Sequence, residues 1–313
     1  MTTQDSAYEL RRGGQGRWAG RRKLLPFIVV ALAAAMAIVL LLSGRGGPGQ
    51  ERLDVTIKEL EAAVLADPQN ADARIALASV YSARGLYANA VAQFQEALTL
   101  RPEDQAALIG LGLAYLRKGE LDAALEPLLR VAEINKDNPR RHSIEQLGTV
   151  YYSLGRIYFE KGDLEQAAAQ VRESLAVRRM DADSWYLLGQ VQERAGQWGE
   201  AVAAYSNAVR FVPDFVDAYR GLERSYQRQG LKGEQAYARG MIRLAESSFN
   251  EAIKDLRQAV ELSPSLAVAH QGLAMAYESA GKKAEALASY RQASALDPDL
   301  MLARLGVQRL EGR

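Results

Sequence analysis

Apolar positions follow two different patterns along this chain of 313 residues. Leu24–Leu42 is a continuous apolar run of 19 residues without a charge. After this run, no stretch alternates apolar and polar residues as a half-buried strand would. Instead, apolar residues return in a similar order every 34 residues, which is the distance from Pro68 to Pro102 and from Pro264 to Pro298. Because 34 residues form one helix–turn–helix unit of a helical solenoid, the pattern predicts stacked helix pairs and an all-α fold.

The order within one period is a Leu-Gly pair, an aromatic residue, alanines and a proline. In 182–215 these residues are Leu188, Gly189, Ala201, Tyr205, Ala208 and Pro213. This order resembles the tetratricopeptide repeat. The resemblance implies a right-handed superhelix of helical hairpins. It covers six repeats, at 71–104, 105–138, 148–181, 182–215, 233–266 and 267–300.

Physical chemistry accounts for these residue types. Small residues let two helices approach closely, a glycine can end the first helix in the left-handed conformation, and a proline cannot continue the second helix. The repeat 233–266 departs from the pattern, because Arg243 stands where Tyr is expected and Ser247 where Gly is expected. Its first helix is therefore the least regular of the predicted set.

Four segments of the predicted solenoid, residues 51–313, lie outside the repeats. Residues 51–66 match the second helix of a repeat and predict an N-terminal cap, and 301–313 predict a closing helix. Nine extra residues, Pro139–Leu147, contain Ser143-Ile-Glu-Gln146, which has the form of a capping box for a helix that starts near Ile144. Residues 216–229 predict an extra helix. It makes three helices in a row, 216–229, 233–246 and 249–262, with a second capping box at Ser248–Glu251, so the regular pitch is expected to break there.

The apolar run near the N-terminus predicts a transmembrane helix. At about 1.5 Å per residue, Leu24–Leu42 would span roughly 28 Å, close to the hydrocarbon thickness of a bilayer. Residues 1–23 carry six basic and two acidic residues, a charge of +4. The positive-inside rule then places this tail in the cytoplasm and the repeats on the other side of a bacterial inner membrane. Residues 43–50 predict a flexible linker with a reach of about 16 Å.

A cleaved signal peptide is the alternative to this anchor. The apolar core of a signal peptide usually has 7–15 residues and ends in small residues. Here the run is longer, and Leu41 or Leu42 would stand where a small residue is needed. A lipoprotein signal would need a cysteine, and the chain has none. The pattern therefore favours an uncleaved, single-pass signal anchor.

Composition argues against several classes of function. The absence of cysteine excludes disulfides and thiolate sites, and the two histidines form no metal-binding or catalytic motif. We therefore expect no enzymatic activity, no metal, no cofactor and no small-molecule substrate. The whole chain has a charge of +1, so residues 24–313 sum to 1 − 4 = −3. A slightly acidic solenoid lacks the basic face that nucleic acid binding needs.

The first helices of such a solenoid would line a groove for a protein partner or a peptide. Family members that hold acidic C-termini carry Lys and Asn at fixed places in this groove, and this chain has no Asn there. The candidate groove residues here are Tyr152, Arg156, Tyr186, Arg194, Arg220, Arg224 and Arg228. The last three recur every four residues and would share one face of helix 216–229. The alternative is a solvated face, with Asp217 and Glu223 as local partners.

The layout indicates a membrane-tethered scaffold or assembly factor that presents its repeats on the extracytoplasmic side. It is similar to single-span tetratricopeptide proteins of bacterial protein export or cytochrome c maturation. Three alternatives stay open: a chaperone for exported chains, a structural component of a secretion or pilus assembly, and an accessory enzyme subunit. Each is expected to bind protein partners and, through Leu24–Leu42, the lipid bilayer.

Overall fold

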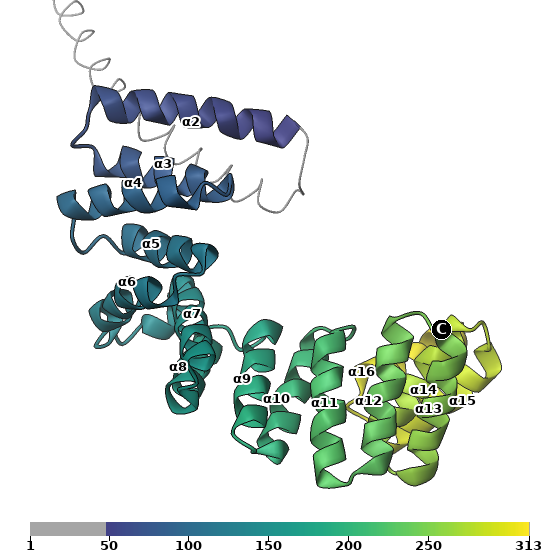
Figure 1. The fold of residues 1–313 in the computed structure, drawn as a ribbon. Coiled ribbons are helices and arrows are strands. Elements are labelled where there is room, and N and C mark those ends of the chain that lie inside the picture. Colours follow the sequence, from purple (N-terminus) through teal and green to yellow (C-terminus); the bar gives the residue numbers. More distant parts are fainter. Residues whose placement is uncertain (1–47, 313) are drawn as a thin grey trace, which may run out of the picture. The chain divides into compact units, whose positions relative to one another are not determined.

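The structure is a computed structural model that describes residues 48–312. These residues form a series of helices (Figure 1). The helices are α2 (Pro48–Ala66), α3 (Ala71–Ala83), α4 (Tyr87–Leu100), α5 (Gln105–Lys118), α6 (Leu121–Asn135), the short 3-10 helix η1 (Arg141–Ser143), α7 (Glu145–Lys161), α8 (Leu164–Val177), α9 (Ala182–Arg194), α10 (Trp198–Phe211), α11 (Val216–Gln229), α12 (Lys232–Ala245), α13 (Phe249–Leu262), α14 (Ala267–Ser279), α15 (Lys283–Leu296) and α16 (Met301–Leu310). Residues 48–312 contain no strand, so the predicted all-α fold is confirmed for them.

The predicted membrane anchor is not part of this description. Among residues 48–312, no helix has both the length and the apolar content that a membrane span requires. The span Leu24–Leu42 and the basic tail 1–23 lie outside the described residues and stay predictions. α2 begins at Pro48, so residues 48–50 of the predicted linker 43–50 are helical.

The helices gather into two compact units, one ending at Lys136 and the other beginning at Asp137. In the first unit, α2 packs against α3. It buries Leu53, Ile57 and Leu60, which lie on one face of the helix. Tyr81 of α3 donates a hydrogen bond to Glu61 at 2.6 Å, and burial together with this bond raises the pKa of Tyr81 to about 12. α2 therefore covers α3 as the second helix of a repeat would.

In the second unit, the extra residues 139–147 form η1 and the start of α7, and η1 packs against α7 and α8. Both predicted capping boxes are wrong. Ser143 belongs to η1, so the N-cap of α7 is Ile144, which has no side-chain oxygen to accept a hydrogen bond. Ser248 is the N-cap of α13, but its side chain accepts no backbone hydrogen bond.

The irregular repeat 233–266 folds with an ion pair in place of the expected aromatic residue. Arg243 lies 2.7 Å from a carboxylate oxygen of Asp255, and Arg239 lies 3.0 Å from the other oxygen. Asp255 is buried, and a buried charge requires such partners. Ser247 adopts the left-handed conformation with φ 61°, where the repeat normally has glycine. The chain thus keeps the turn between α12 and α13 with a residue that is less suited to it.

Between the helices of the second unit, the side chain of Tyr205 fills the space at two glycines. Tyr205 of α10 has no exposed surface. A Cβ atom on Gly189 of α9 would lie 2.6 Å from its ring, and a Cβ on Gly221 of α11 would lie 2.5 Å from it. Real Cβ atoms do not approach so closely, so both positions require glycine. The tyrosine ring therefore fixes how closely α9 and α11 approach α10.

A hydrogen-bonded clamp completes this contact. The Tyr205 hydroxyl donates to Glu193 of α9 at 2.6 Å, and Arg224 of α11 donates to both oxygens of Glu193 at 2.6 and 2.9 Å. Burial raises the pKa of Glu193, but the hydrogen bonds from Arg224 and Tyr205 outweigh it, so the pKa lies below its ordinary value. Burial, and then the hydrogen bond to Glu193, raise the pKa of Tyr205, while the charge of Arg224 lowers it. Bidentate Arg–carboxylate pairs are among the stronger polar contacts in proteins.

We expect Gly221→Ala to destabilise the second unit, because the added methyl group would overlap the buried ring of Tyr205. Overpacking of this kind costs about 1–3 kcal/mol. Gly199→Ala is the matched control, since Gly199 of α10 is also helical and faces open space. Alanine there should stabilise by about 0.5–1 kcal/mol. Urea denaturation followed by circular dichroism measures the free energy of unfolding of both variants. Equal stabilities would contradict the close contact between Gly221 and the Tyr205 ring.

We expect Glu193→Gln to lower the free energy of unfolding by about 1–3 kcal/mol at neutral pH, because it weakens two charged hydrogen bonds. A carboxylate with a lowered pKa stabilises the fold above its unfolded pKa of about 4.3, and this contribution is lost as pH falls through the folded pKa. The variant and the wild type should therefore converge in acid. Glu200→Gln, on the exposed side of α10, should show no such difference. A gap between Glu193→Gln and wild type that persists in acid would show that the charge of Glu193 is not its cause.

Candidate binding surface

All seven candidate groove residues lie in the second unit, on first-type helices, meaning those that correspond to the first helix of a repeat. Tyr152 and Arg156 belong to α7, and Tyr186 and Arg194 belong to α9. The other three arginines belong to α11, which the clamp attaches to α10 and α9 as the first helix of a following repeat. Because α7 contacts α9 and α9 contacts α11, the candidates occupy three neighbouring helices.

The two tyrosines are half-buried, and charges of both signs act on each. The ring of Tyr186 lies 5.7 Å from that of Tyr205 and 4.9 Å from that of Phe215. Burial and then Asp217 of α11 raise the pKa of Tyr186, while Arg224 lowers it. The pKa of Tyr152 is likewise raised by burial and by Asp183 of α9, and lowered by Arg156. An aspartate of the following first-type helix thus raises the pKa of each tyrosine, and an arginine lowers it.

Three of the five candidate arginines hold the fold together. Arg224 is part of the clamp on Glu193. Arg194 donates to the carbonyl oxygen of Phe159 at 3.0 Å, and its guanidinium lies 5.4 Å from the centre of the Phe159 ring. Arg228 lies 5.5 Å from the ring centre of Trp198. Arg220, Arg224 and Arg228 share a helix face, but each has a different partner, so they do not form one free basic stripe.

All five candidate arginines are exposed, and Arg156 and Arg220 are the two on whose contacts the fold depends least. Arg156 is exposed on α7. Arg220 is also exposed and forms ion pairs with Asp217 at 3.0 Å and Glu246 at 3.4 Å. Asp217 is thus the local partner that the alternative interpretation predicts. Exposed ion pairs contribute only about 0–1 kcal/mol, so Arg220 can exchange these carboxylates for those of a ligand at little cost.

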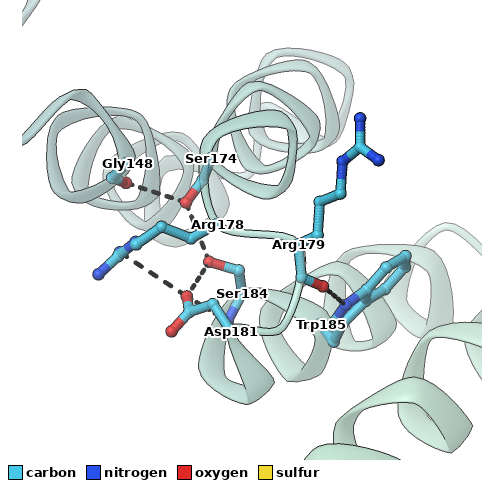
Figure 2. Close-up of polar contacts among 7 residues, drawn as sticks. All are labelled: Gly148, Ser174, Arg178, Arg179, Asp181, Ser184 and Trp185. Carbon is cyan, nitrogen blue, oxygen red and sulfur yellow. Dashed lines mark hydrogen bonds and ion pairs between the residues drawn. The ribbon is translucent and has the colours of Figure 1, made fainter. Parts of the chain in front are cut away.

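Sequence reasoning missed the polar brace that joins α7, α8 and α9 (Figure 2). The buried Ser174 hydroxyl donates to the carbonyl oxygen of Gly148 at 2.9 Å and lies 3.0 Å from the hydroxyl of Ser184. Ser184 in turn hydrogen-bonds to Asp181, the N-cap of α9, and Arg178 lies 3.7 Å from the same carboxylate. At the next repeat boundary the equivalent positions hold Ala208 and Ala218. The two serines in place of these alanines are the sequence feature that could have indicated the brace.

The brace contributes to the structure of the site by joining α7, α8 and α9. Figure 2 shows the Arg178 side chain over the brace and the Arg179 side chain directed away from it. Trp185 adds a hydrogen bond from its indole nitrogen to the carbonyl oxygen of Arg179 at 2.9 Å. These contacts fix the turn between α8 and α9, and with it the positions of Tyr152 and Tyr186. In residues 48–312, no group of three or more His, Asp or Glu side chains is arranged to hold a metal ion.

Comparison with known proteins identifies the repeats. One family model described as "Tetratricopeptide repeat" matches residues 49–102, 75–139 and 152–214. Two further models with the same description match 236–266 and 267–300. The matched ranges include most of the irregular repeat 233–266. They also include most of α2, which corresponds to the predicted N-terminal cap.

Curated relatives are distant and longer. Human tetratricopeptide repeat protein 13 is 25% identical over 190 residues, which are 51% of this chain and 22% of that protein. The peroxisomal targeting signal receptor of Kluyveromyces lactis is 26% identical over 203 residues, 56% of this chain and 36% of the receptor. DnaJ homolog subfamily C member 3 of Gallus gallus is 25% identical over 210 residues, 63% of this chain and 37% of that protein. The chain thus spans between about a fifth and two fifths of the length of these relatives.

Solved structures with similar folds include the C-terminal part of a TPR repeat-containing protein of Cytophaga hutchinsonii, with 16% identity and a TM-score of 0.49 over 88% of this chain and 99% of that one. YrrB, described as a TPR protein with an unusual peptide-binding site, has 21% identity and a TM-score of 0.37 over 68% of this chain and 96% of its own. The family matches, which cover most of residues 49–300, carry the conclusion. This chain belongs to the tetratricopeptide repeat family.

Proposed function

We propose that this protein is a membrane-tethered scaffold that binds a peptide segment of a partner protein across α7, α9 and α11. Proteins of this family mediate protein–protein interaction. The observation that carries the proposal is the pair of half-buried tyrosines, Tyr152 and Tyr186, beside the accessible arginines Arg156 and Arg220. Tyrosine rings cover apolar side chains and guanidinium groups bind carboxylates, so the surface suits a segment that carries both.

One relative supports a role in recognising protein segments. By its name, the peroxisomal targeting signal receptor recognises a targeting signal. A scaffold needs no catalytic groups, and we propose that the protein acts by binding and not as an enzyme. The apolar run Leu24–Leu42 and its basic flank support a tether in a bacterial inner membrane, with the repeats outside the cytoplasm. A scaffold of this kind captures its partner in stoichiometric amounts, whereas a chaperone for exported chains would capture many unfolded chains in small amounts.

The arginines offer the direct test of the binding surface. We expect Arg156→Glu with Arg220→Glu to reduce partner capture several-fold, and more strongly at low salt, because attraction of acidic groups becomes repulsion. Both positions are exposed and the ion pairs of Arg220 contribute only about 0–1 kcal/mol, so the melting temperature should change little. Arg224 is unsuitable for this test, because its substitution would break the clamp on Glu193.

The matched control is Arg172→Glu with Arg210→Glu, which changes the charge equally at exposed positions on the second helices α8 and α10. Wild-type and variant chains are used to capture proteins from detergent-solubilised membranes, and mass spectrometry quantifies each protein retained. If both double variants retain the same proteins in equal amounts, the partner does not bind across α7, α9 and α11.

The tether is tested by cysteine labelling, since the chain contains no cysteine. We expect Ser279→Cys, at an exposed end of α14, to react with a membrane-impermeant maleimide in intact spheroplasts. Ser6→Cys should react only after lysis, because the positive-inside rule keeps the basic tail in the cytoplasm. The opposite labelling pattern would overturn the topology. A protein that begins near Arg45 and is released from the membrane would show a cleaved signal peptide instead.

A further inference from the structure

Helix α12 differs from the other first-type helices in the groove positions of its repeat, the fifth and the ninth. In the neighbouring repeats these positions hold Tyr152 and Arg156, or Tyr186 and Gln190, all of which are half-buried or exposed. In α12 they hold Tyr237 and Met241, which are only 8% and 5% exposed. Among the described repeats, 233–266 is the one that buries both positions. A ligand that follows the first-type helices therefore finds neither of these two positions open at α12.

Tyr237 and Met241 are buried because two first-type helices, α11 and α12, follow each other without a second helix between them. α11 docks on α10 through Gly221, which lies against Tyr205, and α12 pairs with α13 through Gly240, which lies against Leu256. α12 consequently occupies the place where a second helix of α11 would lie. The rings of Tyr219 of α11 and Tyr237 of α12 meet edge to face, with centres 6.2 Å apart. α11 thus covers one groove position of α12. The other, Met241, lies against α14, where a Cβ on Gly272 would be 2.8 Å from its sulfur.

The contacts that hold α11 recur at α16, the last helix of the chain described. Tyr290 donates to Glu278 at 2.9 Å, and Arg309 of α16 donates to Glu278 at 2.6 to 3.0 Å. Each member of this second clamp lies 85 residues after its counterpart in the first, as in 278 − 193, 290 − 205 and 309 − 224. A Cβ on Gly306 of α16 would also overlap the Tyr290 ring, 2.6 Å from its Cε2 atom, as one on Gly221 would overlap the Tyr205 ring.

α16 carries polar residues where a first helix would pack on its own second helix. The fourth and eighth positions hold Arg304 and Gln308, where the repeat 182–215 has Trp185 and Gly189. Arg304 and Gln308 are both exposed, so these two positions offer no apolar contact to a second helix. α11 is therefore attached to the second helix before it by the same clamp as α16, although the chain continues beyond α11.

We propose that α11 is an internal terminating helix, which divides the first-type helices of the second unit into two separate binding surfaces. The first surface is formed by α7, α9 and α11 and stops at α11, and the second begins at α14. The partner of the first surface, which rests on the function proposed above, is then a short segment. Three helices about 10 Å apart span about 20 Å, which an extended chain covers with about six residues. It carries carboxylates for Arg156 and Arg220 and an apolar side chain for the tyrosines.

The division is tested without any ligand, by single cysteines at the same repeat position of three helices. The variants are Gln190→Cys, Met241→Cys and Met275→Cys, in the full chain. We expect a fluorescent maleimide to label the cysteine at 241 at least ten-fold more slowly than the other two, and all three at one rate in guanidinium chloride. Labelling of all three at one rate in the native protein overturns the division.

Hydroxyl-radical footprinting of the wild-type chain answers the same question if Met241→Cys does not fold. Tyr237 and Met241 should then be modified much less than Tyr186 and Met275, and equal modification overturns the division. The partner captured by the wild-type chain provides the last measurement. It should slow the labelling of Gln190→Cys and not of Met275→Cys. If the partner protects both positions, the proposal that its contact stops at α11 is wrong. If it protects neither, the proposed binding surface itself is wrong.

Discussion

The second unit depends on large side chains of the second helices α10, α13 and α15, which fill the space left by glycines on the first helices beside them. Tyr205 shows the arrangement most completely, because its ring lies against Gly189 before it and Gly221 after it. The glycines set the distance between helices and the ring sets their angle, since a close-packed interior leaves neither room to shift. Glu193 and Arg224 then lock the ring through its hydroxyl group. The candidate residues of α9 and α11 lie on the two helices that this ring joins to α10.

This dependence changes the meaning of the arginines. A spacing of four places Arg220, Arg224 and Arg228 on one face of a helix, but it says nothing about which other helices that face meets. In the folded chain the same face meets Glu246, Glu193 and Trp198 in succession. Only an arginine without a demanding structural role can serve a ligand at little cost in stability. Arg156 and Arg220 meet this condition, so the proposed recognition and the stability of the fold rest on different members of one set of residues.

The irregular features of the chain have a common explanation. A buried charge replaces an aromatic residue in 233–266, two serines replace two alanines between α8 and α9, and one helix is present without its pair. Each is tolerated because a neighbouring group satisfies it: two arginines for Asp255, Gly148 and Asp181 for the serines, and α12 for the open side of α11. A repeat contacts only its neighbours, so such changes can be compensated locally.

The sequence alone determined the fold class, the repeats and the extra helix at 216–229, because these follow from periodic small and apolar residues that each helix pair requires. It also provided the candidate residues on α7, α9 and α11. Only the tertiary structure decided which of them are engaged within the fold, that Tyr237 and Met241 are buried, and that neither predicted capping box forms. The physical reason is that local spacing determines the face of a helix, whereas partners such as Glu193 for Arg224, 31 residues away, depend on how the helices pack.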